Sequence, residues 1–104
     1  MLKIYDVMIA VIGDLKKALP AIETCDRDLG RQLRRAASSV ALNLAEGSGS
    51  SGGTRRERYR NALGSAREVG ACLDVAEAFG YTTVVGDVRD GLRQVQATLV
   101  RVLA

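Results

Sequence analysis

Apolar residues recur three and four positions apart in four separate segments of the chain. This spacing places them on one face of a helix, whereas a half-buried strand would alternate at every second position. It predicts helices over about residues 2–19, 27–46, 55–79 and 83–103. Four helices with short connections predict an all-α fold, an antiparallel up-and-down four-helix bundle, with residues 1–104 as one domain.

Apolar stripes define the face that each helix is expected to bury. The first and second helices carry one stripe each: Tyr5, Met8, Ile9, Ile12, Leu15 and Leu19, then Leu29, Leu33, Ala36, Val40 and Leu44. The last helix carries Val84, Val88, Leu92, Val95, Leu99 and Val102. The third carries two stripes: Tyr59, Leu63, Ala66, Gly70 and Leu73, then Ala62, Val69, Cys72, Ala76 and Phe79. So wide an arc exceeds the need of one bundle core and favours self-association.

Residues that favour helix ends mark two of the boundaries. Pro20 is expected to close the first helix, because the residue before a proline is driven out of the helical conformation. Asp26 or Asp28 is expected to begin the second helix, where an acidic side chain can accept hydrogen bonds from free backbone N–H groups. Gly64 and Gly70 weaken the third helix, which suggests close approach by a neighbouring backbone. Gly80 is expected to end it.

The connection between the second and third helices is rich in glycine and serine. Gly47 fits the position that commonly ends a helix. Residues 47–53, GSGSSGG, are predicted by their composition to form a flexible link. The alternative, a phosphate-binding P-loop, is disfavoured because its lysine is missing. Thr54 and Glu57 have the spacing of a capping box and are expected to start the third helix.

Composition argues against catalysis and against metal or cofactor binding. The chain has no histidine, and Cys25 and Cys72 form no metal-ligand pattern, so we expect both thiols to be buried. A nucleophile beside a base, or a pair of catalytic carboxylates, is not recognisable. The N-terminal apolar stretch is too short and too closely flanked by acids for a secretory signal or membrane span. We expect a cytoplasmic protein that is not an enzyme.

Positive charge is concentrated in the middle of the chain. The net charge is only +3, but residues 27–67 hold nine arginines against three acidic residues. Arginine suits bidentate contacts with phosphate better than lysine does. The candidate nucleic-acid-binding residues are Arg31, Arg34, Arg35, Arg55, Arg56, Arg58 and Arg60, with Arg27 at the same helical spacing. The alternative is a solvated face with local ion pairs, such as Arg31 with Asp28 and Arg60 with Glu57.

A polar line runs beside the apolar stripe of the second helix. Arg35, Ser39, Asn43 and Glu46 follow one another at steps of four, four and three residues. They are expected to lie along one helix edge and to bridge to a neighbouring helix or subunit. Hydrogen bonding is the simpler interpretation, because buried polar groups generally find partners.

Three sequence blocks resemble those of a known family. The first comprises Arg34, Arg35, Ala36, Ser39, Asn43, Ala45, Glu46 and Gly47; the second, Gly64, Ser65 and Glu68; the third, Phe79, Gly80 and Tyr81. Their order and spacing are similar to those of the four-helix-bundle proteins encoded in intervening sequences of bacterial 23S ribosomal RNA genes. Accessory variability proteins of diversity-generating retroelements belong to the same fold family.

The resemblance implies a bundle that assembles into a homopentameric ring. In the retroelement branch such rings engage a reverse transcriptase and nucleic acid through a basic surface. By this resemblance, the protein is expected to be an oligomeric adaptor that contacts RNA, DNA or a nucleic-acid enzyme through its arginines. A protein-interaction module whose arginines only keep it soluble is the alternative.

Overall fold

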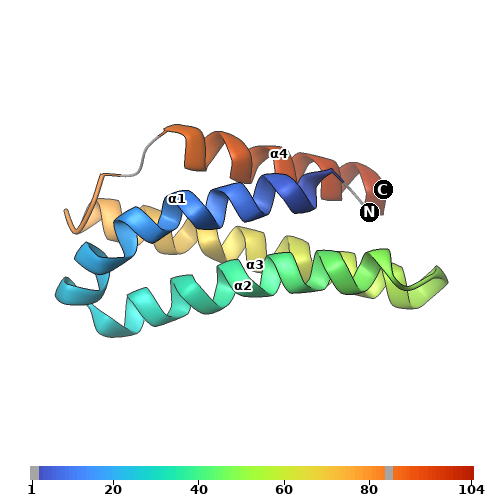
Figure 1. Ribbon diagram of the computed structural model, residues 1–104, viewed down its shortest axis with the longest axis horizontal. Coiled ribbons are helices and arrows are strands. Elements are labelled where there is room, and N and C mark those ends of the chain that lie inside the picture. Colours follow the sequence, from blue (N-terminus) through green and yellow to red (C-terminus); the bar gives the residue numbers. More distant parts are fainter. Residues whose placement is uncertain (1–2, 84–85) are drawn as a thin grey trace.

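The computed structural model describes residues 3–83 and 86–104, and within these ranges the chain forms four helices (Figure 1). They are α1 (Ile4–Cys25), α2 (Arg27–Ser48), α3 (Gly52–Ala78) and α4 (Gly86–Leu103). The prediction of an all-α, four-helix protein is confirmed. Leu2 and Val84, placed by the sequence at the starts of the first and last helices, lie outside the described residues.

Each helix packs along two neighbours, in the order α1, α2, α3, α4 and back to α1. Ser39 of α2 meets Ser65 of α3, and closer to the connecting turn Glu46 meets Arg58. Residue numbers therefore rise along α2 as they fall along α3. The α2–α3 turn extends beyond the ends of α1 and α4 (Figure 1), and the molecule measures 42 × 23 × 20 Å.

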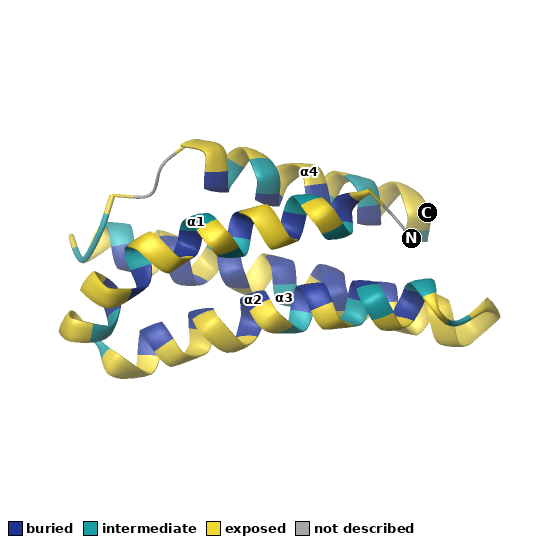
Figure 2. Ribbon diagram, viewed as in Figure 1, coloured by how far each residue is buried: buried dark blue, intermediate teal, exposed yellow. Residues whose placement is uncertain are grey.

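The core fills the space between the four helices, while their outer faces are exposed (Figure 2). All five predicted stripe residues of α2 are buried. The stripe of α1 is rotated from the prediction, because α1 packs against both α2 and α4. Ile9 is 46% exposed, and Val11 instead lies against Gly91 of α4, where an added Cβ would be 2.6 Å from Val11 Cγ2. The buried α1 residues are Ile4, Met8, Val11, Leu15, Leu19 and Ile22.

Both apolar stripes of α3 are buried within the single chain. The interpretation that the third helix has more apolar surface than one bundle core needs is therefore wrong. α3 packs against α2 on one side and α4 on the other, and so needs two buried faces. Of the ten stripe residues only Phe79 is exposed, and Gly70 is half-buried. The suggested close approach at Gly64 is also wrong, because an added Cβ there would meet nothing within 4 Å.

Pro20 does not end α1, contrary to prediction. The helix continues for five residues to Cys25 and stops where Asp26 adopts an extended conformation. Burial of Ile22 against the core offsets the lost backbone hydrogen bond at the proline. This extension places Cys25 on the surface, whereas burial was expected. As predicted, Asp26 caps α2, accepting a hydrogen bond from the Leu29 N–H at 3.0 Å.

The α2–α3 connection is much shorter than the predicted flexible segment. α2 runs through Gly47 to Ser48, and α3 starts at Gly52, so only residues 49–51 lie outside helices. Gly47 is buried and helical, and it does not end α2. The Thr54–Glu57 capping box is also wrong: the N-cap residue is Ser51, and its side chain makes no capping hydrogen bond. Gly80, with φ +76°, follows the end of α3 as predicted.

Candidate nucleic-acid interface

Arginines of α2 project from the side of the helix that faces away from the core. Leu29, Leu33 and Val40 lie on the face of α2 that packs into the core, so side chains on the opposite face of the helix are exposed to solvent. Arg27, Arg31, Arg34 and Arg35 are all exposed there. Arg27, omitted from the candidate binding residues, belongs with them by the same helical spacing.

Two surface grooves join these arginines to the start of α3. The first, of about 570 Å3, is lined by Glu23, Thr24, Arg27, Arg31 and Arg34. The second, of about 470 Å3, is lined by Arg34, Arg35, Ser38, Ser39, Leu42, Asn43, Glu46 and Arg58. Because Arg34 lines both grooves, the basic surface is continuous from the α1–α2 corner to α3. We call Arg27, Arg31, Arg34, Arg35 and Arg58 the arginine belt.

Two members of the belt form ion pairs. Arg34 Nη2 lies 2.8 Å from Glu23 Oε1, and Arg58 Nε lies 3.2 Å from Glu46 Oε2. All four side chains are at least 40% exposed, so each pair contributes about 1 kcal/mol or less to stability. These weak pairs leave the two arginines able to exchange partners.

The other three belt arginines keep their charge uncommitted. Within residues 3–83 and 86–104, no carboxylate oxygen lies within 4.0 Å of the guanidinium nitrogens of Arg27, Arg31 or Arg35. In the same part of the chain, the expected local pairs of Arg31 with Asp28 and Arg60 with Glu57 do not form. The belt therefore offers free donors to an anionic partner.

Arg55 and Arg56 have a different role, because they bind the ends of other helices. Arg55 Nε donates to the carbonyl oxygens of Gly47 at 3.1 Å and Ser50 at 2.8 Å, at the end of α2. Arg56 Nη2 donates to the carbonyl oxygen of Leu103, near the end of α4. The Leu103 oxygen lies at a helix end, where carbonyl groups lack intrahelical N–H partners. The Gly47 oxygen also accepts from the Ser50 N–H at 3.2 Å, and Ser50 lies in the α2–α3 turn.

This arrangement explains why cations crowd the first turns of α3. Positive charge there opposes the dipole of α3 but complements the negative ends of α2 and α4, which lie beside it. α2 has no basic residue in its own last turn, and Arg55 supplies one. Arg60 is exposed and has no ion pair in the described ranges. Four arginines lie near the start of α3, and two of them, Arg58 and Arg60, therefore remain available to a partner.

The polar line beside the α2 stripe bridges to α3. Asn43 Nδ2 donates to the Ser39 carbonyl oxygen at 2.9 Å and to Ser39 Oγ at 3.1 Å. Ser65 Oγ of α3 donates to Ser39 Oγ at 2.8 Å. With the Glu46–Arg58 pair, this makes a polar seam between the helices and agrees with the hydrogen-bonding interpretation. Sequence spacing within α2 alone gave no sign that Ser65 joins it.

The surface has no geometry that indicates metal or membrane chemistry in the part of the chain that the structure describes. No group of three or more histidine, cysteine or acidic side chains there converges on a common point. Nor does any helix among those residues combine the length and the apolar character that crossing a bilayer requires. Thr54 and Glu57, the expected capping pair, are simply exposed.

Sequence comparison agrees with this helical architecture. Residues 2–101 match the family described as 23S rRNA-intervening sequence protein. The chain belongs to this family. No curated protein and no solved structure gives a significant match. The matched range contains α1, α2, α3 and all but the last two residues of α4, and so it includes the polar seam and the arginine belt.

Proposed function

We propose that this protein is a non-enzymatic, cytoplasmic adaptor that contacts RNA or DNA phosphates through the arginine belt. The observation that supports it is the continuity of the belt, in which Arg34 joins two grooves and Arg27, Arg31 and Arg35 have no competing carboxylate among the described residues. The family's description names 23S rRNA intervening sequences, so RNA is tested as a partner beside DNA.

The chemistry of the belt suits the backbone of a nucleic acid rather than its bases. Guanidinium groups bind phosphate oxygens in a bidentate manner, and a neighbouring hydroxyl group such as that of Ser38 can add a neutral hydrogen bond. Aromatic side chains that would stack on bases do not line either groove. We therefore expect salt-sensitive binding with little preference for sequence.

We further propose that the antiparallel up-and-down bundle assembles into a homopentameric ring. This rests on the resemblance to ring-forming relatives, which also suggests a reverse transcriptase or another nucleic-acid enzyme as a partner. Large apolar side chains that are exposed on one chain are available for such contacts: Ile9, Leu42, Val75, Phe79, Val100 and Val102. A ring would repeat the belt and raise the affinity for a long nucleic acid through multivalency. Multi-angle light scattering would give the mass directly.

Binding can be tested by fluorescence anisotropy with a short structured RNA and a duplex DNA at two salt concentrations. Replacing Arg27, Arg31 and Arg35 by glutamine removes the three free belt charges and leaves both belt ion pairs in place. We expect this triple variant to weaken binding and to reduce the slope of log affinity against log salt by roughly one unit per arginine.

The matched control changes the same number of arginines outside the belt. Arg67, Arg93 and Arg101 are exposed on α3 and α4, so their replacement by glutamine lowers the net charge equally. We expect this control to retain most of the affinity. Equal losses in the two variants would mean that only net charge matters. No binding at low salt by the folded protein would favour the alternative, a module for protein–protein interaction.

A further inference from the structure

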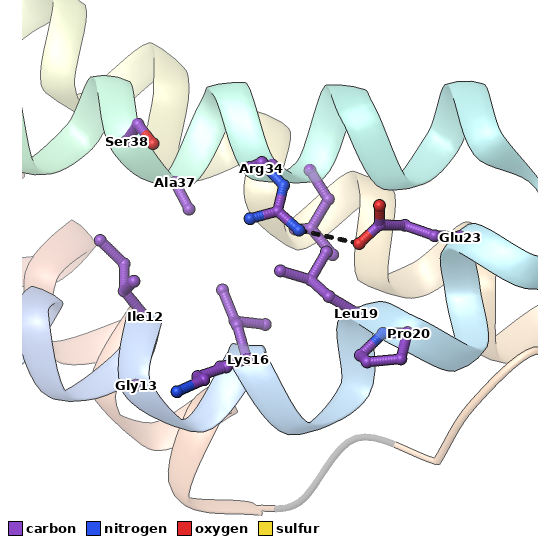
Figure 3. A pocket seen from close by; sticks show the side chains of 11 residues that line it. Ile12, Gly13, Lys16, Leu19, Pro20, Glu23, Arg34, Ala37 and Ser38 are labelled. Atoms are coloured by element: carbon purple, nitrogen blue, oxygen red, sulfur yellow. Dashed lines mark hydrogen bonds and ion pairs between the residues drawn. The ribbon is translucent and has the colours of Figure 1, made fainter.

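A cleft of about 490 Å3 lies between α1 and α2 (Figure 3), and it shares Arg34 with both grooves of the arginine belt. Leu15, Leu19 and Leu33, all buried core residues, line its inner side. Ile12 and Ala37 extend the apolar lining. Its volume falls within the range of about 300–1,000 Å3 that is usual for small-molecule sites, which are mainly apolar with few polar groups.

Two residues that weaken helices line the α1 wall of this cleft. Gly13 and Pro20 lie two turns apart on one side of α1. In a helix interior they cost about 1 and 3 kcal/mol relative to alanine. Gly13 has no left-handed φ, and an added Cβ would meet nothing within 4 Å, so packing within the chain does not require glycine there. The absence of a side chain at Gly13 leaves open space in the cleft.

The mouth of the cleft carries two cations and one anion. Lys16 and Arg34 both line it, together with Glu23. Glu23 is already held by Arg34 at 2.8 Å, whereas the ammonium of Lys16 has no carboxylate within 4.0 Å among residues 3–83 and 86–104. The rim is therefore net positive beside an apolar interior. This charge complements a ligand with a negative head group.

We propose that the cleft binds a small amphiphilic carboxylate, with its hydrocarbon body against Leu15, Leu19 and Leu33 and its carboxylate near Lys16. A carboxylate matches the rim in charge, because it carries one negative charge and the free charge at the rim is a single exposed ammonium. Burial of each methylene against the leucines would contribute about 0.8 kcal/mol. Ligand binding at this cleft would be a function additional to nucleic-acid binding. Neither Lys16 nor Gly13 belongs to the arginine belt.

The boundaries of the cleft favour a small molecule over a helix of another protein. The Arg34–Glu23 ion pair joins α2 to α1 at the Leu19 end of the cleft (Figure 3). A partner helix needs a long trough for anchors at positions i, i+3, i+4 and i+7, and this bridge would obstruct it. A compact ligand fits beside the bridge without breaking it.

Isothermal titration calorimetry with decanoate, below its micellar concentration, tests the proposal on the intact protein. Decanol and decylamine are the comparison ligands, because they share the hydrocarbon chain but carry a neutral or a positive head group. We expect decanoate to bind about tenfold or more tightly than either, roughly the effect of one charge contact near a protein surface. Amide NMR shifts on adding decanoate should be concentrated at residues 12–23 and 33–38.

Filling the cleft provides a steric test that does not threaten folding. Gly13→Leu should lower decanoate affinity at least about tenfold, while better helix propensity keeps the protein folded. Gly64→Leu is the matched control, because Gly64 is also an exposed helical glycine with nothing within 4 Å but lies outside the cleft. Lys16→Gln should weaken binding about tenfold, and Lys17→Gln should not.

Three results would overturn the proposal. The first is no decanoate binding by the folded protein. The second is equal binding of decanol, which would remove the role of the rim charge. The third is a change of oligomeric mass in Gly13→Leu but not in Gly64→Leu, which would show that a second copy of the chain occupies the cleft.

Discussion

The ring of Tyr59 occupies the space that a side chain at Gly47 would need. A Cβ added to Gly47 would lie 2.7 Å from Tyr59 Cδ1, and closer still to Cε1. Both residues are buried, and Gly47 has an ordinary helical φ. Glycine is therefore present at the end of α2 to admit the tyrosine, not to end the helix.

Gly47→Ala is expected to destabilise the protein by about 1–3 kcal/mol, because the methyl group forces the Tyr59 ring to move in a packed region. This loss should occur although alanine is the better helix former. Urea unfolding followed by circular dichroism would measure it.

Gly64→Ala provides the control, since an added Cβ there meets nothing within 4 Å. It should stabilise the protein by about 0.5–1 kcal/mol, the difference in helix propensity. If both alanine variants stabilise the protein, the Gly47–Tyr59 contact does not constrain the fold.

Local pattern was sufficient for some features of the fold and insufficient for others. The α2 stripe and the cap at Asp26 were predictable, because both depend on residues within one or two turns. Gly47 could not be interpreted correctly, since its role depends on Tyr59, twelve positions further along. Pro20 was misjudged for a similar reason: burial of Ile22 extends α1 past it.

The candidate site shows the same division between local and distant information. Helical spacing placed Arg31, Arg34 and Arg35 on one exposed face, as the structure has them. It could not separate Arg55 and Arg56 from them, because their function depends on where the ends of α2 and α4 lie in space. Composition revealed the charge, and only the packing shows which arginines are already engaged.

Arg55 is expected to stabilise the bundle by binding the end of α2. Arg55→Gln should lower the free energy of unfolding by about 1 kcal/mol, because two backbone carbonyl oxygens lose a charged donor. Arg60→Gln should be close to neutral, since Arg60 is exposed, lies more than two turns into α3 and has no ion pair in the described ranges. Chemical denaturation of the two variants decides this, and a greater loss in Arg60→Gln would contradict it.

Arg89 holds α4 against α3, although the sequence gave no sign of it. Its side chain is 24% exposed, its Nη1 lies 3.0 Å from Asp74 Oδ1, and its Nη2 pairs with Glu77. Burial by itself would lower the pKa of Arg89, but the hydrogen bond and charge of Glu77, with the charge of Asp74, raise it overall. The side chain is therefore charged at every physiological pH.

Arg89→Met is expected to cost about 1–3 kcal/mol, because two carboxylates lose their shared partner. The effect should be insensitive to pH between 6 and 9, since the guanidinium does not titrate there. Arg93→Met is the control: Arg93 and Asp90 are 69% and 72% exposed, so their pair should contribute about 0.5 kcal/mol or less. Similar losses in both variants, measured by urea unfolding, would mean that the Arg89 contacts add nothing to an ordinary surface pair.

The two thiols should differ sharply in reactivity. Cys25 is exposed and should react rapidly with a thiol reagent in the native protein, whereas Cys72 is buried and should react only when the protein opens. Burial, assisted by the negative charge of Glu68, raises the pKa of the Cys72 thiol. The folded state therefore favours the protonated thiol more than the unfolded state does.

A raised pKa gives this thiol a defined effect on stability. Its contribution is fully present below the ordinary thiol pKa of about 8.5, and it is lost as the pH rises through the higher folded value, because the unfolded chain ionises first. Wild-type stability should accordingly fall between pH 8 and 9.5 more steeply than that of Cys72→Ala. Urea unfolding across this range measures the two slopes, and parallel slopes for wild type and Cys72→Ala would show that the Cys72 thiol has no part in the alkaline loss.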